Sequence, residues 1–314
     1  MNARTLRLGS RRSPMAIAQS LQVAGLITER TGYQVEIVGV TTLGDVSRAQ
    51  LTQIGGTGVF AGALREALLG GEVDLAVHSL KDLPTGSAAG IVLAAVPARD
   101  DPRDALVARD GAKLADLPAG ARIGTGSPRR AAQLLGLRAD LRCVPIRGHA
   151  GTRLAKGDDG EVDAVVLAYA GLARIDCVGA ITQVFEPDEM LPAPGQGALA
   201  VECRDGEPEL AALLGAVNDP ASMAAAAAER SLLAALEAGC SAPVGAYAAG
   251  LEQLRMHAAV MSTDGSRVLR AHGVAPGADA RQLGRDLAAE LLRSGASDLI
   301  SVPQARTSSG NDVQ

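Results

Sequence analysis

Short apolar runs alternate with stretches of helical spacing along the first hundred residues. Strands are predicted by the runs at residues 5–9, 34–41, 73–77 and 91–96. Ser13-Pro14 favours a helix start, because serine caps a helix and proline fits its first position. A second helix is predicted by the apolar face that runs from Val59 to Leu68. This alternation predicts a mostly parallel sheet flanked by helices.

A second α/β series follows a break in the pattern. Residues 97–104 (PARDDPRD) hold two prolines and five charges, which suits a crossing between domains. Ser127-Pro128 then predicts another helix start. Further strands are predicted at residues 105–107, 122–124, 142–146 and 163–168. A second break at 192–197 (PAPGQG) precedes a strand at 198–202.

The pattern changes again at Asp219. An Ala-rich helix is predicted to about Leu236, then strands near residue 246, at 256–261 and at 268–271, and a Leu-rich helix after them. We therefore predict an α/β protein with two similar lobes and a smaller C-terminal α+β domain. The predicted domains are 1–97 with 198–216, 98–197 and 217–302, followed by a disordered tail at 303–314.

Composition narrows the classes of protein. No apolar run in the 314 residues approaches the roughly 18 of a membrane span, and a strand-like start leaves no room for a signal peptide. We therefore expect a cytoplasmic protein that does not bind membranes. We also expect no nucleic-acid binding, since the net charge is −5. The four cysteines and four histidines show no metal-ligand spacing, so we expect no metal site and no disulfide framework.

The segment VDLAVHSLKDLP (73–84) carries the first candidate chemistry. Lys81 and Asp82 follow a buried strand, at the edge where open α/β sheets place ligands. A carboxylate there can stabilise a cation that develops during a reaction. The alternative is that Asp82 only starts a turn before Pro84.

Arginine outnumbers lysine by 27 to 3, and several arginines cluster. In TGSPRR (125–130), Ser127 caps a predicted helix, and Arg129 and Arg130 lie where the helix dipole disfavours positive charge. An anion site would explain this placement; codon bias and a solvated face are the alternatives. We expect exchange of either arginine for Leu to weaken anion binding and to leave folding almost unaffected. Further arginines follow predicted strands or start helices, namely Arg11 (with Ser13), Arg147, Arg153 and Arg174.

Cys240 follows Gly239 at the end of the Ala-rich helix and precedes Pro243. Its loop position favours a functional thiol. The alternative is an inert cysteine of the kind that fills protein cores.

Six motifs together resemble the hydroxymethylbilane synthase (porphobilinogen deaminase) family. They are HSLKD (78–82), TGSPRR (125–130), RGHAGTR (147–153), AGLAR (170–174), PGQGA (194–198) and AERSLLAALEAGCSAPVG (228–245). The resemblance runs from Arg11 to at least Gly245. It implies two lobes like those of periplasmic binding proteins, with an active site between them.

The resemblance also implies the activity and its residues. The family joins four porphobilinogens head to tail on a dipyrromethane cofactor, releasing ammonia and a linear hydroxymethylbilane. Cys240 would hold the cofactor by a thioether, and Asp82 would stabilise the cationic azafulvene. Cofactor-binding positions would be Lys81, Ser79, Ser127, Arg129, Arg130, Arg147 and Gly148. Substrate-binding positions would be Arg11, Ser13, Arg147, Arg153, Arg174 and Gln196. The substrate partner would be porphobilinogen, bound by a monomer.

Three positions depart from the family pattern. Thr57 replaces a usual Lys, Leu43 a usual Arg, and His149 a usual Asn. The first two remove positive charge from one loop, and His149 adds a titrating group beside the anion site.

Two other functions would fit such a fold. One is a two-lobed anion-binding protein without catalysis, which the third domain and Cys240 disfavour. The other is a DNA-binding regulator, which would need a helix-turn-helix before residue 5.

Overall fold

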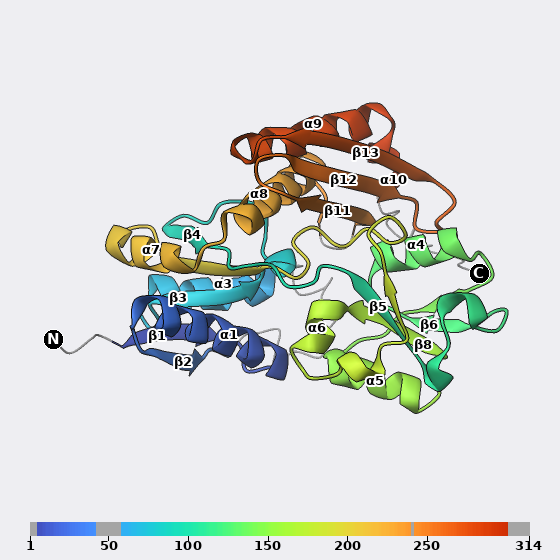
Figure 1. Cartoon of the computed structure of the whole chain (residues 1–314), viewed down its shortest axis with the longest axis horizontal. Helices are drawn as coiled ribbons and strands as arrows, with labels where there is room; N and C mark the ends of the chain where they lie inside the picture. Colours follow the sequence, from blue (N-terminus) through green and yellow to red (C-terminus); the bar gives the residue numbers. More distant parts are fainter. Residues whose placement is uncertain (1–4, 42–57, 240–241, 301–314) are drawn as a thin grey trace, which may run out of the picture.

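The computed structural model describes residues 5–41, 58–239 and 242–300. Over these residues it contains three sheets, one in each of two lobes and one in a C-terminal domain that lies above both (Figure 1). The α/β fold with two lobes and a smaller C-terminal domain is thus confirmed. The tail at 303–314 lies outside the described residues.

The first lobe has a five-stranded sheet in the order β2-β1-β3-β10-β4. Its strands are β1 (Leu6–Ser10), β2 (Val35–Gly39), β3 (Leu75–Ser79), β4 (Ile91–Ala95) and β10 (Leu199–Arg204). Its helices are α1 (Pro14–Thr31), α3 (Gly58–Leu69) and α7 (Pro208–Leu214). One face packs on α1 through Val23 and Ile27, and the other packs on α3 through Leu64 and Leu68.

The second lobe repeats this arrangement in the order β7-β6-β8-β5-β9. Its strands are β5 (Asp104–Ala108), β6 (Arg122–Gly124), β7 (Arg142–Val144), β8 (Ala164–Ala168) and β9 (Gln183–Phe185). Its helices are α4 (Pro128–Leu137), α5 (Ala150–Asp158) and α6 (Tyr169–Ala173). The predicted strands and capped helices are therefore present, with ends shifted by a few residues.

The sheets are less parallel than predicted. In each lobe the fourth strand, β10 or β5, runs antiparallel to both of its neighbours. Each of these strands enters its lobe directly after the chain has crossed from the other one, near residues 96–103 and 186–198. These crossings support the domain boundaries 1–97 with 198–216, 98–197 and 217–302, which we propose on that basis.

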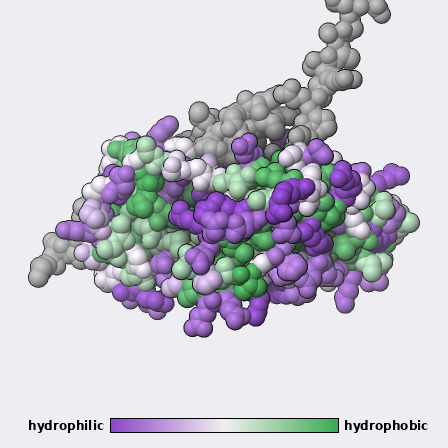
Figure 2. Space-filling view, turned by 90° about the horizontal axis from the view of Figure 1, so that it is seen from above, coloured by the Kyte–Doolittle hydropathy of each residue, from purple (hydrophilic) through white to green (hydrophobic). Residues whose placement is uncertain are grey.

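The C-terminal domain is an antiparallel three-stranded sheet covered by helices. It consists of α8 (Pro220–Ala235), β11 (Val244–Ala249), β12 (Leu254–Met261), β13 (Val268–Ala275), α9 (Ala280–Arg293) and α10 (Ala296–Ile300). Gly284 lets α9 approach α8 closely, because a Cβ there would lie 2.2 Å from the Ala228 carbonyl oxygen. Seen from above, the surface mixes hydrophobic and hydrophilic side chains, and hydrophilic ones gather in the middle of the view (Figure 2).

No single helix of the described residues is long and apolar enough to cross a membrane. One bent pair, residues 208–217 with 220–235, meets the criteria by length and composition across a 107° break.

Candidate functional site

Asp82 and Lys81 are presented by a short 3₁₀ turn (Leu80–Asp82) at the end of β3. Leu80 is 1% exposed, and its N–H donates to the Ala198 carbonyl at 3.0 Å, so the second crossing fixes the turn. Leu80 and Leu83 pack in one cluster with Ala226 of α8. Between these two anchors, Lys81 is half-buried and Asp82 is exposed.

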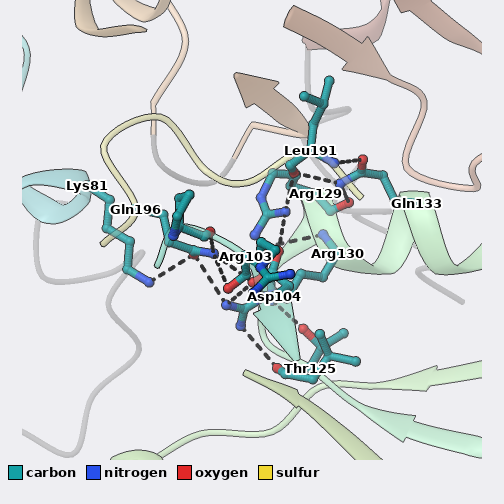
Figure 3. A network of polar contacts seen from close by, with 12 residues as sticks. Lys81, Arg103, Asp104, Thr125, Arg129, Arg130, Gln133, Leu191 and Gln196 are labelled. Carbon is teal, nitrogen blue, oxygen red and sulfur yellow. Dashed lines mark hydrogen bonds and ion pairs between the residues drawn. The ribbon is translucent and has the colours of Figure 1, made fainter. Parts of the chain in front are cut away.

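Lys81 points toward the second lobe. Its Nζ donates to Gln196 Oε1 at 3.3 Å (Figure 3). Burial lowers the pKa of Lys81 to about 8, and the attraction of Asp82 offsets only part of this effect. Lys81 therefore titrates much closer to neutrality than an ordinary lysine.

Arg129 and Arg130, in the first turn of α4, share one buried carboxylate, that of Asp104 at the start of β5. Arg129 Nη1 lies 2.7 Å from Asp104 Oδ2, and Arg130 Nε lies 2.9 Å from Asp104 Oδ1 (Figure 3). The three residues are at most 5% exposed. Burial raises the pKa of Asp104, but the two guanidinium charges outweigh this effect and hold it well below its usual range. Arg129 also donates to the Leu191 carbonyl, and Arg130 to that of Val166.

This arrangement contradicts the expectation that exchange of either arginine would leave folding almost unaffected. Asp104 is the internal anion that compensates both charges, and removal of an arginine would leave part of a buried carboxylate without its partner. Sequence analysis missed Asp104 because it was counted among the charges of the crossing. The available signal was an Asp directly before the apolar run Ala105-Leu106-Val107.

Gln196 connects Lys81 with the buried cluster of Asp104, Arg129 and Arg130. It is 1% exposed, and its Nε2 donates to Asp104 Oδ1 and to the Pro102 carbonyl, both at 2.8 Å. Its Oε1 accepts from Lys81 and, at 3.4 Å, from Arg130 Nη2. Gln196 thus lies in the chain crossing as a link between the first lobe and the buried ion cluster of the second.

Arg153, in the first turn of α5 in the second lobe, lies within electrostatic range of Asp82. Its pKa is lowered by burial and by repulsion from Arg130, while attraction to Asp82 opposes both. Its Nε donates to the Gly148 carbonyl at 2.8 Å. Arg147 and Gly148, just before α5, are exposed. Asp82, in the turn after β3, and Arg153, in α5, are thus within electrostatic range of each other across the two lobes.

The remaining predicted positions have mainly local partners. Ser13 and Ser127 cap α1 and α4, accepting from the N–H groups of Ala16 and Arg130. Arg174 Nη2 binds Asp100 Oδ2 at 2.7 Å and the Gly197 carbonyl at 2.9 Å. Arg11 and Ser79 are half-buried at the ends of β1 and β3.

A second buried ion pair, also missed by sequence analysis, anchors the C-terminal domain to the crossings. Arg99 of the first crossing binds both carboxylate oxygens of Glu229 in α8, at 2.6 and 3.1 Å. Glu229 is fully buried and also accepts from the N–H groups of Gly195 and Ala248. This carboxylate therefore joins both crossings to β11.

Cys240, Thr57 and Leu43 lie outside the described residues. Close to Cys240 in the sequence, the Ala242 N–H donates to the Gly239 carbonyl, and the Ala246 N–H donates to the Pro192 carbonyl in the second crossing. No group of three or more His, Cys, Asp or Glu residues in the described ranges could hold a metal ion.

Two family models match the chain. One, described as "Porphobilinogen deaminase, dipyromethane cofactor binding domain", covers residues 6–212, and "Porphobilinogen deaminase, C-terminal domain" covers 223–293. A porphobilinogen deaminase from Thermobifida fusca is 58% identical over 96% of this chain and 97% of its own length. Porphobilinogen deaminase 1 of Streptomyces coelicolor is 52% identical over 96% and 98%.

Among solved structures, a periplasmic substrate-binding protein of an ABC transporter from Coxiella burnetii aligns at a TM-score of 0.43 and 18% identity, over 72% of this chain and 96% of that one. This similarity is too low to support an argument. The two family models and the relatives, by contrast, cover nearly the whole chain. The chain belongs to the porphobilinogen deaminase family.

Proposed function

We propose that this protein joins four porphobilinogen molecules head to tail onto a covalently bound dipyrromethane primer and releases ammonia and hydroxymethylbilane. One observation carries the proposal: Asp82 interacts electrostatically with Lys81 beside it and with Arg153 of the second lobe. The chain that holds these residues matches both family models. One carboxylate suits a developing cation, and the surrounding cations suit substrate carboxylates.

The residues present fit the dipyrromethane by their chemistry. This group carries carboxylate side chains and pyrrole N–H groups; Lys81, Arg147 and Arg153 offer cations, and Asp82 offers an exposed acceptor. When bound, it supplies the pyrrole carbon to which the first porphobilinogen is joined. We propose Cys240 as the thioether position, and Ser79, Ser127 and Gly148 as further cofactor contacts.

Asp82 acts on the charge that forms as ammonia leaves. The C–N bond of the protonated aminomethyl group breaks, its electron pair leaves with nitrogen as neutral ammonia, and the positive charge passes to the pyrrole and its methylene carbon. A fixed carboxylate stabilises this charge more than bulk water does, because the site is partly shielded from solvent. Arg153 and Lys81 limit the conformations of the substrate by holding its carboxylates.

The proposed binding residues differ in how exposed they are and in which partners they contact. Arg153 is well placed to touch substrate directly, since it is half-buried and within electrostatic range of Asp82, and Arg147 is exposed just before α5. Arg11 with Ser13, and Arg174, are proposed at the margin of the same site. Arg129, Arg130 and Gln196 act from the buried cluster and position Lys81.

The direct test is incubation of the purified protein with porphobilinogen. Ammonia release together with formation of a linear tetrapyrrole supports the proposal. Binding of porphobilinogen without ammonia release would favour an anion-binding protein instead.

Cys240 should carry the primer. The purified protein should weigh more than its sequence by one two-pyrrole unit under denaturing conditions, because a thioether survives unfolding. Peptide mapping should place this mass on Cys240, and Cys240→Ser should abolish the attachment. Detection of the added mass on Cys143, Cys177 or Cys203 would refute the assignment.

Substrate capture should weaken at alkaline pH because Lys81 loses its charge near pH 8. Lys81→Arg keeps a positive charge at every accessible pH. We expect kcat/KM of the parent, divided by that of the Arg variant, to fall about tenfold or more between pH 7 and 9.5, as expected for one lost charged hydrogen bond. A ratio independent of pH would exclude Lys81 from binding the substrate.

We further propose that the protein works in the cytoplasm as a monomer. The described cysteines Cys143, Cys177 and Cys203 are free thiols, as expected in a reducing compartment. Light scattering coupled to size exclusion tests the oligomeric state.

A further inference from the structure

His149 forms the N-terminal cap of α5. Its backbone is extended (φ −71°, ψ 169°), and its Nδ1 accepts from the Thr152 N–H at 3.3 Å. Its own carbonyl accepts the first helical hydrogen bond, from the Arg153 N–H at 3.1 Å. Asp, Asn, Ser and Thr are the usual residues here, and their oxygens accept at all pH values at which the protein is folded. An imidazole differs because its acceptor can gain a proton.

The contacts of the ring identify its protonation state. Thr152 Oγ1 lies 2.9 Å from Nε2, while the Thr152 N–H points at Nδ1. Both contacts are satisfied only when Nε2 carries the proton and donates to the hydroxyl, and Nδ1 accepts. In the imidazolium both nitrogens carry protons, so the cap bond is lost. The cap therefore exists only with a neutral His149.

The cap also determines where Arg153 lies. Gly148 has φ +106°, and a Cβ at this position would lie 2.9 Å from Thr152 Cβ, so Thr152 packs directly on the Gly148 backbone. The Gly148 carbonyl accepts from Arg153 Nε at 2.8 Å. His149 holds Thr152, and Thr152 packs on Gly148. The Gly148 carbonyl in turn holds the guanidinium of Arg153, which is within electrostatic range of Asp82.

Positive charges already lie at the start of α5. The nearest ionisable neighbours in the sequence, Arg147 and Arg153, are cations, and a third positive charge at a helix start opposes the helix dipole. Among the strands packed on α5, β5 and β6 carry only Asp104 and Arg122, each paired with residues other than His149, and β8 carries no charge. Asp82 acts on Arg153 from the other lobe.

We propose that His149 is a proton-sensitive positioning residue: its neutral ring caps α5 and aims Arg153 at the substrate, and its protonation releases both. This inference rests on the proposed function, since it concerns the same site. Porphobilinogen binding should consequently weaken on acidification.

The test compares the parent with His149→Asn and His149→Ala, each loaded with cofactor, between pH 8 and 5.5. Asn caps without titrating, so the ratio of KM between parent and Asn variant cancels every other titration. This ratio should rise about fivefold on acidification, the size expected for one lost cap, with the kcat ratio constant. The Ala variant, which cannot cap, should have a higher KM than the Asn variant at every pH.

A KM ratio that is flat would overturn the proposal. A ratio that falls on acidification would overturn it too, because it would mean that the imidazolium binds substrate carboxylates directly.

The cap itself is tested separately by NMR of the same proteins. The amide resonance of Thr152 should shift with pH in the parent and stay constant in the Asn variant. Failure of all the proteins to release ammonia would refute the proposed function, whereas a Thr152 amide that does not titrate in the parent would refute the cap.

Discussion

Exchange of Asp82 for Asn should slow ammonia release by at least about 10²-fold, by analogy with the loss of one preorganised group in an oxyanion hole. Asn keeps the size of the side chain and removes the charge. The backbone around residue 82 should be unchanged, because Leu80 and Leu83 anchor the turn and the Asp82 side chain itself is exposed. The measurement is single-turnover ammonia release from enzyme already loaded with its cofactor, which separates this step from product release.

Two variants control for other effects of the change. Asp82→Glu keeps the charge and moves it by one methylene, so it should retain more activity than Asn. Asp286→Asn makes the same change on the exposed face of α9 and should leave the rate unaltered. If Asp82→Asn released ammonia within a few-fold of the parent, Asp82 would be only a residue of the turn before Pro84.

The environment of Asp82 explains why one carboxylate can have so large an effect. Lys81 and Arg153 lie within its electrostatic range, and burial has lowered the pKa of both. Lys81 and Arg153 are thus partly shielded from water, and their Coulomb interactions are stronger than those between fully solvated charges. Substrate carboxylates placed on the cations would leave Asp82 to interact with the developing positive charge.

Local sequence signals predicted the elements well. The apolar run at 73–77 became β3 (Leu75–Ser79), and the pairs Ser13-Pro14 and Ser127-Pro128 became capped helix starts, because strand burial and helix capping depend on neighbouring residues. Strand direction is set by distant partners. The antiparallel β5 and β10 therefore could not be distinguished from parallel strands by their apolar pattern.

In the candidate site, too, local signals predicted the positions of residues but not their distant partners. Asp82 after a strand and Arg153 at a helix start were predicted to lie at the strand-end edges of the two lobes, where a cleft between the lobes would open. The partners of the arginines could not be predicted in this way. Asp104 is 25 residues from Arg129, and Glu229 is 130 residues from Arg99; only the folded chain brings these charges together.

Exchange of Asp104 for Asn should be among the most destabilising single changes in the second lobe. It would leave the guanidinium groups of Arg129 and Arg130 buried without their shared carboxylate, and breaking a buried pair in this way costs about 3–5 kcal/mol. The remaining carbonyl acceptors, on Leu191 and Val166, carry no charge to replace it. Urea unfolding of the cofactor-loaded protein measures the loss as a shift of the midpoint to lower urea.

The matched control is Asp140→Asn, which breaks an ion pair with Arg138 on the surface of the same lobe, where the Asp140 side chain is 42% exposed. Solvent already screens that pair, so its loss should shift the midpoint far less.

The pH dependence of stability provides a second test of the Asp104 cluster. The pKa of Asp104 is held below the ordinary value near 3.9, so its contribution is present above that pH and is lost as pH falls further. Between pH 7 and 3 the parent should therefore lose more stability than the Asp104→Asn variant. Equal losses in the two proteins, or a midpoint close to that of Asp140→Asn, would show that Asp104 does not hold the arginine pair, and Arg129 and Arg130 would then again require an external anion.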